Sequence, residues 1–419
     1  MEALDVTGLT IARAAQLIHA RELSPLELTE AYLRRIESLN PTINAYVTVT
    51  ADRALGDARW ATDEIVAGRY RGPLHGIPIG LKDLFATAGI RTTGGAKFLA
   101  DSVPVLDSTV ARKLREAGTV LLGKTNTHEL AFGGTTNNPH YGPTRNPWKL
   151  DRIPGGSSGG SAAAIAAGIA CGTTGTDTAA SIRLPAAFTG VVGLKPTYGR
   201  VSKAGVIPLS FLFDHPGPIT RTVEDSALML EAMAGYDPDD CSTVPMPVGS
   251  YTAHLRDGIR GLRLGVPRDW FFDDLDDEVR AAVETAIDVL REQGAAVRDV
   301  TIAGVGEAVL ARRRITETEF RQYHAPVFAE RPLDFSPDLR AVLQQPPLGG
   351  HVVAGLLRTV RATAEAMRRT LTEVDVLVTA TVPFPAPRIG QETVRRGDAE
   401  EGLVMPLIRL TSPFNATHL

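Results

Sequence analysis

The sequence has very few cysteines and no strong excess of one charge. Only Cys171 and Cys241 occur among 419 residues, which excludes a disulfide framework and any site built from several cysteine ligands. The formal net charge is −4, from 44 basic and 48 acidic residues, and this balance favours neither a nucleic-acid partner nor an anionic membrane. We therefore expect a reducing, cytoplasmic compartment and no direct contact with nucleic acid.

Long apolar runs are also missing. Charged residues recur at short intervals through the first thirty positions, so no signal segment is expected there. The longest apolar stretch, residues 161–171, reads SAAAIAAGIAC and is too short to span a bilayer. With 43% hydrophobic and 22% charged residues, the composition is that of an ordinary globular protein without a membrane partner.

Helical and strand patterns alternate along the chain. Short apolar runs typical of strands occur at residues 77–81, 120–122, 190–194, 262–266 and 374–378. Helical periodicity lies between them, at residues 109–117, 161–169, 223–234, 277–293 and 353–373. This alternation is typical of an α/β fold with a mixed, largely parallel central sheet covered by helices on both faces.

The first seventy residues are helical by pattern. Ser24 and Pro25 form a helix start, and Asn40-Pro41 is expected to stop that helix. A further helical stretch covers residues 51–67. We therefore predict that residues 1–70 form a helical segment packed on a single α/β domain of residues 71–419. Within that domain, the Pro-rich segment 324–350 is a candidate excursion over the functional site.

A Gly- and Ser-rich loop stands out at residues 153–161, which read IPGGSSGGS and lead directly into an Ala-rich helical stretch. Such a loop could bind a phosphate at the helix N-terminus. However, it lacks a Gly-Lys-Ser/Thr ending, and no GxGxxG pattern follows a strand. It could instead supply a buried hydroxyl to a catalytic site or form a plain structural turn, and the loop alone does not decide between these interpretations.

A second cluster, residues 175–185, reads GTDTAASIRLP and places Ser181 after small residues whose N–H groups could converge on an oxyanion. A serine is a weak nucleophile unless a base takes its proton. No histidine lies within this block and Ser181 does not stand in a GxSxG elbow, although counting alone leaves a Ser-His-Asp triad open. Lys82 ends the apolar run GIPIGLK, and burial there would lower its pKa toward that of a useful base.

Together these three segments resemble the amidase-signature family. The resemblance is carried by GIPIGLKDL, PGGSSGGS and TDTAASIRLPAAFTGVVGLKPT, with 75 residues from Lys82 to Ser157 and 24 from Ser157 to Ser181. Further agreement is found at residues 123–126, 145–148, 198–202 and 217–221. The signature core spans about residues 74–235, and the likeness is weaker over the divergent part, residues 240–419.

The resemblance implies a Ser-Ser-Lys relay. Ser181 would be the acylated nucleophile, and Ser157, preceded by a cis peptide bond, would pass protons between Ser181 and the base Lys82. Asp177 and Arg183 are expected to brace the loop around the nucleophile. The residues expected to bind the oxyanion or the substrate are Thr178, Ala179, Ala180, Ala131, Gly133, Gly134 and Ser158. The implied reaction hydrolyses a small-molecule amide, anilide or carbamate, with esters as further substrates, and needs no metal or organic cofactor.

The sequence departs from the family pattern in two places. Ala179-Ala180 replaces the usual Gly-Gly before the nucleophile, so a Cβ could crowd the oxyanion site or strain a backbone that needs a positive φ. The sequence also stops at Leu419, where family members continue into a further strand and helix. Either the sequence is truncated or the edge of the sheet is finished differently.

Two alternatives follow from the same resemblance. One is the glutamine-hydrolysing component of a tRNA-dependent amidotransferase, although Leu184 stands where that component typically has Gln. The other is a family member that has lost activity through Ala179-Ala180. The resemblance also allows a homodimer.

Overall fold

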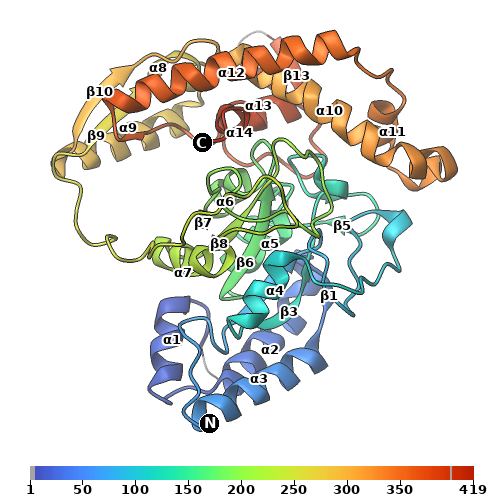
Figure 1. Cartoon of the computed structure of the whole chain (residues 1–419), viewed down its shortest axis with the longest axis vertical. Coiled ribbons are helices and arrows are strands. Elements are labelled where there is room, and N and C mark those ends of the chain that lie inside the picture. The colour runs from blue at the N-terminus through green and yellow to red at the C-terminus, as the bar shows by residue number, and fades with distance from the viewer. Residues whose placement is uncertain (1–4, 397–398) are drawn as a thin grey trace.

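The centre of the molecule is a six-stranded mixed sheet in the order β1-β3-β2-β6-β8-β7 (Figure 1). The computed structural model describes residues 5–396 and 399–419. The strands are β1 (Tyr46–Val49), β2 (Pro78–Lys82), β3 (Val120–Thr125), β6 (Gly172–Asp177), β7 (Val192–Gly193) and β8 (His215–Thr220). The three central strands β3, β2 and β6 pair in parallel, and the pairings outside them are antiparallel.

Helices flank this sheet. The N-terminal helices are α1 (Ile11–His19), α2 (Pro25–Ile43) and α3 (Ala51–Val66), and those that follow are α4 (Thr109–Glu116), α5 (Gly159–Ala166), α6 (Arg183–Thr189) and α7 (Val223–Met233). Helix α5 contacts β2, β3, β6 and β8, helix α7 contacts β7 and β8, and α2 and α3 contact β3. The predicted α/β fold, with a mixed sheet flanked by helices, is confirmed.

Helix α2 begins as predicted and ends later than predicted. Ser24 caps it, with the Ser24 hydroxyl and the Glu27 carboxylate each accepting the other's backbone N–H. The helix continues through Pro41 to Ile43, so the prediction that Asn40-Pro41 stops it is wrong. Pro41 lies in the last turn, where the missing N–H removes only one bond near the end. Asn44, with a φ of 56°, ends the helix in the left-handed conformation.

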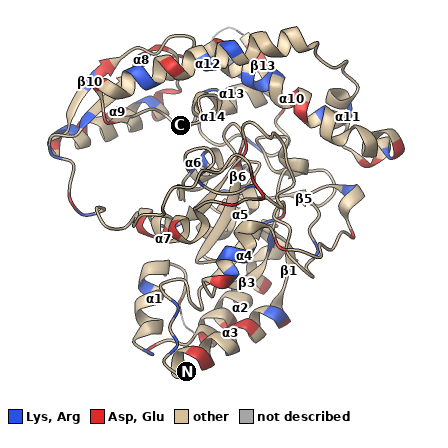
Figure 2. Ribbon diagram, in the orientation of Figure 1, with Lys and Arg blue, Asp and Glu red and all other residues tan. Residues whose placement is uncertain are grey.

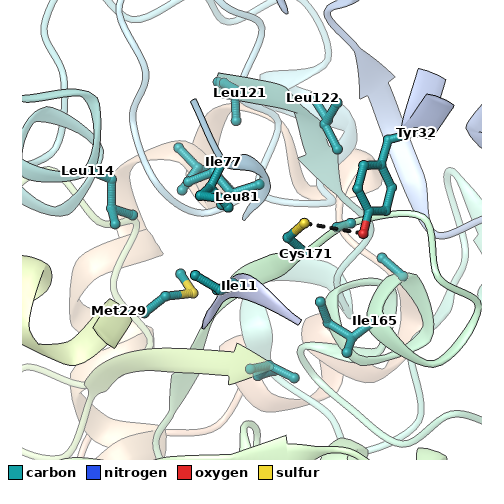
Figure 3. Packing of buried hydrophobic residues seen from close by; sticks show 14 of the residues in the cluster. Ile11, Tyr32, Ile77, Leu81, Leu114, Leu121, Leu122, Ile165, Cys171 and Met229 are labelled. Carbon is teal, nitrogen blue, oxygen red and sulfur yellow. Dashed lines mark hydrogen bonds between the residues drawn. The ribbon is translucent and has the colours of Figure 1, made fainter. Parts of the chain in front are cut away.

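The largest apolar core joins the N-terminal helices to the sheet. Figure 3 shows Ile11 of α1 and Tyr32 of α2 packed with Leu81 of β2 and Ile165 of α5. Cys171 lies in the same core, and its thiol donates to the Tyr32 hydroxyl over 3.2 Å. Burial therefore explains this cysteine, as expected of a small packed residue.

A second, three-stranded parallel sheet follows residue 260. It consists of β9 (Arg263–Pro267), β10 (Ala296–Val300) and β11 (Val376–Leu377), and its helices are α8 (Arg268–Phe271), α9 (Asp277–Glu292), α10 (Val305–Glu330) and α12 (Gly350–Glu373). The strands expected near residues 262–266 and 374–378 belong to this sheet. It lies at the opposite end of the molecule from α1–α3 (Figure 1). The division of the chain near residue 70 stays a prediction.

Short elements complete the structure. They are the hairpins β4 (Asn137–Asn138)–β5 (Gly142–Pro143) and β12 (Thr393–Arg396)–β13 (Ala399–Gly402), the helices α11 (Pro337–Leu343), α13 (Val404–Ile408) and α14 (Ser412–Ala416), and the 3-10 turns η1 (Lys97–Leu99), η2 (Glu129–Ala131) and η3 (Pro332–Asp334). Helix α14 packs against α10, beneath the arch that α10 and α12 form in Figure 1. Both signs of charge are interspersed along the outer helices (Figure 2). Within the described residues, no helix is both long and apolar enough to cross a membrane.

Candidate active site

The lysine and serine segments meet at the ends of two neighbouring parallel strands. Lys82 is the last residue of β2, and its fully buried side chain points at the Gly- and Ser-rich loop. Its Nζ donates to Ser157 Oγ over 2.7 Å and to Thr176 Oγ1, on β6, over 2.8 Å. The structure therefore joins Lys82 and Ser157 directly, although 75 residues separate them in the chain.

Burial has a large effect on Lys82. Removal from water lowers the pKa of Lys82 to about 7, and the carboxyl groups of Asp214 and Asp177 offset only part of this shift. At neutral pH about half of a lysine with such a pKa is uncharged. Lys82 can therefore accept a proton at neutral pH, which an exposed lysine rarely does.

The loop that carries Ser157 is held in a narrow space. The Gly156–Ser157 peptide bond is cis, as the resemblance implied. His128 N–H donates to the Ser157 carbonyl over 3.1 Å, and Thr136 Oγ1 donates to the Gly155 carbonyl over 2.8 Å. A Cβ on Gly156 would lie 2.8 Å from the backbone nitrogens of Thr135 and Thr136, so the loop requires glycine there.

Ser181 lies between β6 and α6 and keeps 8% of its surface exposed, whereas Lys82 and Ser157 are fully buried. Its carbonyl accepts a hydrogen bond from Ser158 N–H over 3.3 Å, which ties the two serine loops together. The Ser158 hydroxyl faces β6 and contacts the Thr176 backbone at 3.3 Å. Of the two contacts that the predicted relay needs, the structure has the one between Lys82 and Ser157. Within the described residues the Ser181 hydroxyl makes no hydrogen bond.

The backbone before Ser181 has its carbonyls occupied and its N–H groups free. The carbonyl oxygens of Asp177, Thr178 and Ala179 accept from Asn415, Arg312 and Arg183 respectively. Across the described parts of the chain, no residue accepts a hydrogen bond from the N–H groups of residues 178–181. A row of such N–H groups beside a serine hydroxyl can bind an oxyanion.

Asp177 and Arg183 form the ion pair that braces this loop. Arg183 Nη2 lies 2.8 Å from Asp177 Oδ1, and Asp177 Oδ2 also accepts from the Ile182 N–H over 3.0 Å. Burial alone would raise the pKa of Asp177, but the Arg183 guanidinium and the hydrogen bonds hold that pKa well below its usual range. The carboxylate is therefore charged at neutral pH.

Ala179 and Ala180 are accommodated without backbone strain. Neither belongs to the described residues with a positive φ, so the expectation of a possible strained backbone at this position is wrong. Ala180 is 1% exposed and packs in an apolar cluster with Leu184 of α6 and Leu407 of α13. Its methyl group therefore belongs to an apolar surface, called here the wall beside Ala180, to which Leu407 of the C-terminal helix α13 also contributes.

The turn predicted to contact substrate lies beside His128 and Leu407. Leu130 and Ala131 adopt left-handed φ angles of 49° and 60°, an uncommon conformation that clusters at functional sites. A Cβ on Gly133 would lie 2.3 Å from the His128 ring, and one on Gly134 would lie 3.3 Å from Leu407. The turn thus contacts both His128, which bonds to Ser157, and the wall beside Ala180.

The segment predicted as an excursion over the site covers this turn from outside. It consists of the end of α10, η3 and α11. Ser336 N–H donates to Glu129 Oε2 over 3.1 Å, and Phe335 and Leu339 share a buried cluster with Ala131. Phe132 packs its ring 4.8 Å from that of Phe320 on α10. This turn is therefore backed by apolar and aromatic side chains.

Sequence reasoning missed three residues of the site. Thr176 contacts the Lys82 ammonium, Asp214 accepts from the Thr178 hydroxyl, and Asn415 binds Asp177. Thr176 lies in a Gly- and Thr-rich stretch without an apolar strand pattern, and Asn415 lies in the divergent part of the chain. Within the described residues, no group of three or more His, Cys, Asp or Glu side chains has the arrangement of a metal site.

Comparison with known proteins gives consistent matches along the chain. A family model described as Amidase matches residues 27–419. An amidase from Pseudomonas putida is 44% identical over 99% of this chain and 88% of its own length. A glutamyl-tRNA(Gln) amidotransferase component from Trichlorobacter lovleyi is 42% identical over 92% of this chain and 84% of its own length. The crystal structure of a bacterial aryl acylamidase of the amidase signature enzymes superimposes with a TM-score of 0.91 at 28% identity, over 99% of this chain and 88% of that chain.

Proposed function

The chain belongs to the Amidase family, and from this premise we propose that it hydrolyses small-molecule amide-type C–N bonds through an acyl-enzyme on Ser181. The observation that carries the proposal is the 2.7 Å contact between Ser157 Oγ and a buried lysine whose pKa is about 7. Such a pair can remove a proton from a neighbouring serine at neutral pH.

Acylation begins with proton transfer along the relay. Neutral Lys82 accepts the proton of Ser157, and Ser157 accepts the proton of Ser181 as Ser181 Oγ forms a bond to the substrate carbonyl carbon. The Ser157–Ser181 contact closes when substrate is bound, since catalytic hydrogen bonds are often long in the free enzyme. The developing oxyanion accepts from the free N–H groups of residues 178–181, each worth about 3–4 kcal/mol when well placed.

Release of the amine reverses the proton path. The tetrahedral intermediate collapses, the C–N bond breaks, and the proton held by Lys82 returns through Ser157 to the leaving nitrogen. Water then attacks the acyl carbon, the same relay takes one of its protons and returns that proton to the departing Ser181 oxygen, and the carboxylic acid product loses its remaining proton to solvent as a carboxylate. Atoms and charges balance using only these side chains and water.

The apolar surroundings favour an uncharged acyl group. Ala180 and Leu184 belong to one apolar cluster and Ala131 to another. Amides and anilides with aliphatic or aromatic acyl groups suit such walls, and carbamates and esters share the same tetrahedral chemistry.

The test is a panel of anilides, primary amides, aryl carbamates and glutamine, incubated with the purified wild type and with Ser181→Ala. We expect amine release from at least one amide-type member by the wild type only. Equal release by Ser181→Ala would refute the role of Ser181, and no release from any member by a folded wild type would refute the proposed function.

Glutamine hydrolysis is the second candidate, because a glutamyl-tRNA(Gln) amidotransferase component is 42% identical to this chain. That function would require recognition of a charged α-amino and α-carboxylate group. Leu184, where that component typically has Gln, is fully buried in an apolar cluster, which favours the first candidate. Glutamine as the sole substrate in the panel would reverse this preference.

A further inference from the structure

The side chain of Asn415 reaches the nucleophile loop from the C-terminal helix α14, although 238 residues separate it from Asp177 in the chain. Its Nδ2 donates to both the carbonyl oxygen and the Oδ1 of Asp177, each over 2.9 Å. Its Oδ1 accepts from Arg183 Nη2. Asn415 is fully buried, so these bonds do not compete with water.

Two neighbouring arginines extend the same arrangement. Arg183 Nη1 donates to the Thr411 carbonyl over 2.8 Å, and its Nη2 donates to the Ala179 carbonyl over 3.3 Å. Arg312 of α10, which is 3% exposed, donates from Nε to Ser412 Oγ over 2.7 Å and from Nη1 to the Thr178 carbonyl over 3.5 Å. Three successive carbonyls are therefore bound by side chains of α14, α10 and α6.

The orientation of these carbonyls fixes the orientation of the N–H groups. In a planar trans peptide unit, the carbonyl of one residue and the N–H of the next point in opposite directions. Binding the carbonyl of Asp177 therefore turns the N–H of Thr178 the other way, and the carbonyls of Thr178 and Ala179 do the same for the next two residues. None of these N–H groups donates a hydrogen bond to a described residue.

We propose that Asn415 is a positioning residue for catalysis, which orients the oxyanion donors of the Ser181 loop by holding the Asp177 carbonyl from behind. The inference rests on the proposed function, since it concerns the transition state of that reaction. It predicts an effect on transition-state binding and little effect on ground-state binding of the substrate.

The chemistry of the amide group explains why asparagine is needed at position 415. The amide nitrogen offers two donors to the two Asp177 oxygens, while the amide oxygen accepts from Arg183. An aspartate has the same size but presents only acceptors, so it would set a second carboxylate against Asp177. Alanine removes the amide donor from the Asp177 carbonyl and leaves there only the His215 Nδ1, 3.2 Å away, whose donor role depends on the ring tautomer. Serine keeps a single shorter donor.

The test compares Asn415→Ala, Asn415→Asp and Asn415→Ser with the wild type on the best amide substrate from the panel. We expect Asn415→Ala to lower kcat by about 10- to 100-fold with KM changed by less than about threefold. Asn415→Asp should be slower still. A trifluoromethyl ketone analogue of the substrate, which forms an oxyanion on the nucleophilic serine, should lose affinity by the same factor as kcat.

The matched control is Thr417→Val, which removes a buried hydroxyl just beyond the same helix without touching the nucleophile loop. Its Oγ1 donates to the Pro413 carbonyl over 2.9 Å and contacts the Met367 sulfur. This variant should lower the melting temperature and leave kcat and ketone affinity at wild-type values. If Asn415→Ala does not fold, Asn415→Ser is compared with the wild type instead. We then expect a kcat below that of the wild type and an unchanged KM.

The proposal and the proposed function fail in different ways. A folded wild type without Ser181-dependent hydrolysis contradicts the proposed function. An active wild type whose folded Asn415 variants keep kcat within twofold overturns the positioning role alone. Parallel losses of kcat and folded fraction, with unchanged ketone affinity per folded molecule, also overturn it.

Discussion

The Lys82 side-chain nitrogen lies 2.7 Å from the Ser157 hydroxyl oxygen, at the end of a buried strand and against a loop that is 75 residues away in the chain. A fully buried lysine is costly unless it is neutral or paired. Here its pKa falls to about 7, and its partners are two hydroxyl groups. The pair is therefore arranged for proton transfer, and this arrangement makes several outcomes measurable.

Replacing Lys82 by methionine should abolish hydrolysis. Methionine keeps the length and apolar stem but offers no nitrogen base, so we expect kcat/KM to fall at least about 10³-fold. Steady-state kinetics on the best substrate measure this. Lys113→Met is the matched control and should leave activity unchanged, because Lys113 Nζ donates to the carbonyl of Ala234, the C-cap residue of α7. More than a tenth of wild-type activity in Lys82→Met would contradict the assignment of the base.

The pH profile should follow the deprotonation of Lys82. Activity needs the neutral amine, so kcat/KM should rise through about pH 7, the pKa of Lys82, and level off above it. The profile is measured over pH 5–9 with a substrate that does not ionise in that range. A limb that falls through pH 7, or a rise centred near pH 4 as expected for the buried His128, would assign the base elsewhere.

Lys82 should also reduce stability at neutral pH. Its folded-state pKa lies below its unfolded value of 10.5, so the unfolded chain takes up a proton between about pH 10.5 and 7 that the folded chain does not. Stability is therefore lost as pH falls through this window and changes no further below it. Lys82→Met should melt at a higher temperature than wild type at pH 7, with the difference shrinking toward pH 10. A difference that grows toward pH 10 would contradict the shift.

Gly156→Ala should disturb the relay loop. The added Cβ would lie 2.8 Å from two backbone nitrogens, which cannot move away as a flexible side chain could. We expect a loss of about 1–3 kcal/mol in the free energy of unfolding and a large fall in kcat. Gly249→Ala, at an open position without a positive φ, is the control and should be neutral. Wild-type activity in Gly156→Ala would mean that the loop is not held as described.

Ala180→Gly restores the residue usual in the family, and we expect no gain from it. The Ala180 methyl packs against Leu184 and Leu407, and its backbone lacks a positive φ. Removing the methyl should cost about 1 kcal/mol of stability, with kcat within about twofold of wild type. Thermal melts and steady-state kinetics together decide this. A tenfold rise in kcat would show that the methyl crowds the oxyanion site.

The sequence indicated the contact between the Lys82 and Ser157 segments better than it indicated the sheet around them. The segments that hold Lys82, Ser157 and Ser181 resemble the family pattern residue by residue. Strands β6 and β8 were not predicted, because they read GTTGTD and HPGPIT and lack apolar runs. Both are buried along their whole length, and they pair with each other in antiparallel register. Burial of hydroxyls beside a lysine removes the periodicity on which strand prediction depends.

The contacts that the C-terminal residues make with the Ser181 loop could not be predicted from the sequence, for a different reason. Asn415 acts through hydrogen bonds to Asp177 across 238 residues, and nothing in its local sequence indicates a partner at that distance. The extension of α2 through Pro41 was likewise missed, because the cost of a proline depends on its place within the last helical turn. Long-range polar contacts and the exact ends of helices could therefore be established only from the structure.

The most direct test of the account is to identify the residue that carries the acyl group. The wild-type protein is mixed with an activated aryl ester, quenched during the first turnover, digested and mapped by mass spectrometry. The account predicts one acyl group per chain on the peptide containing Ser181, formed slowly or not at all in Lys82→Met and Ser157→Ala. Acylation at another residue, or undiminished acylation and turnover in Ser181→Ala, would contradict it.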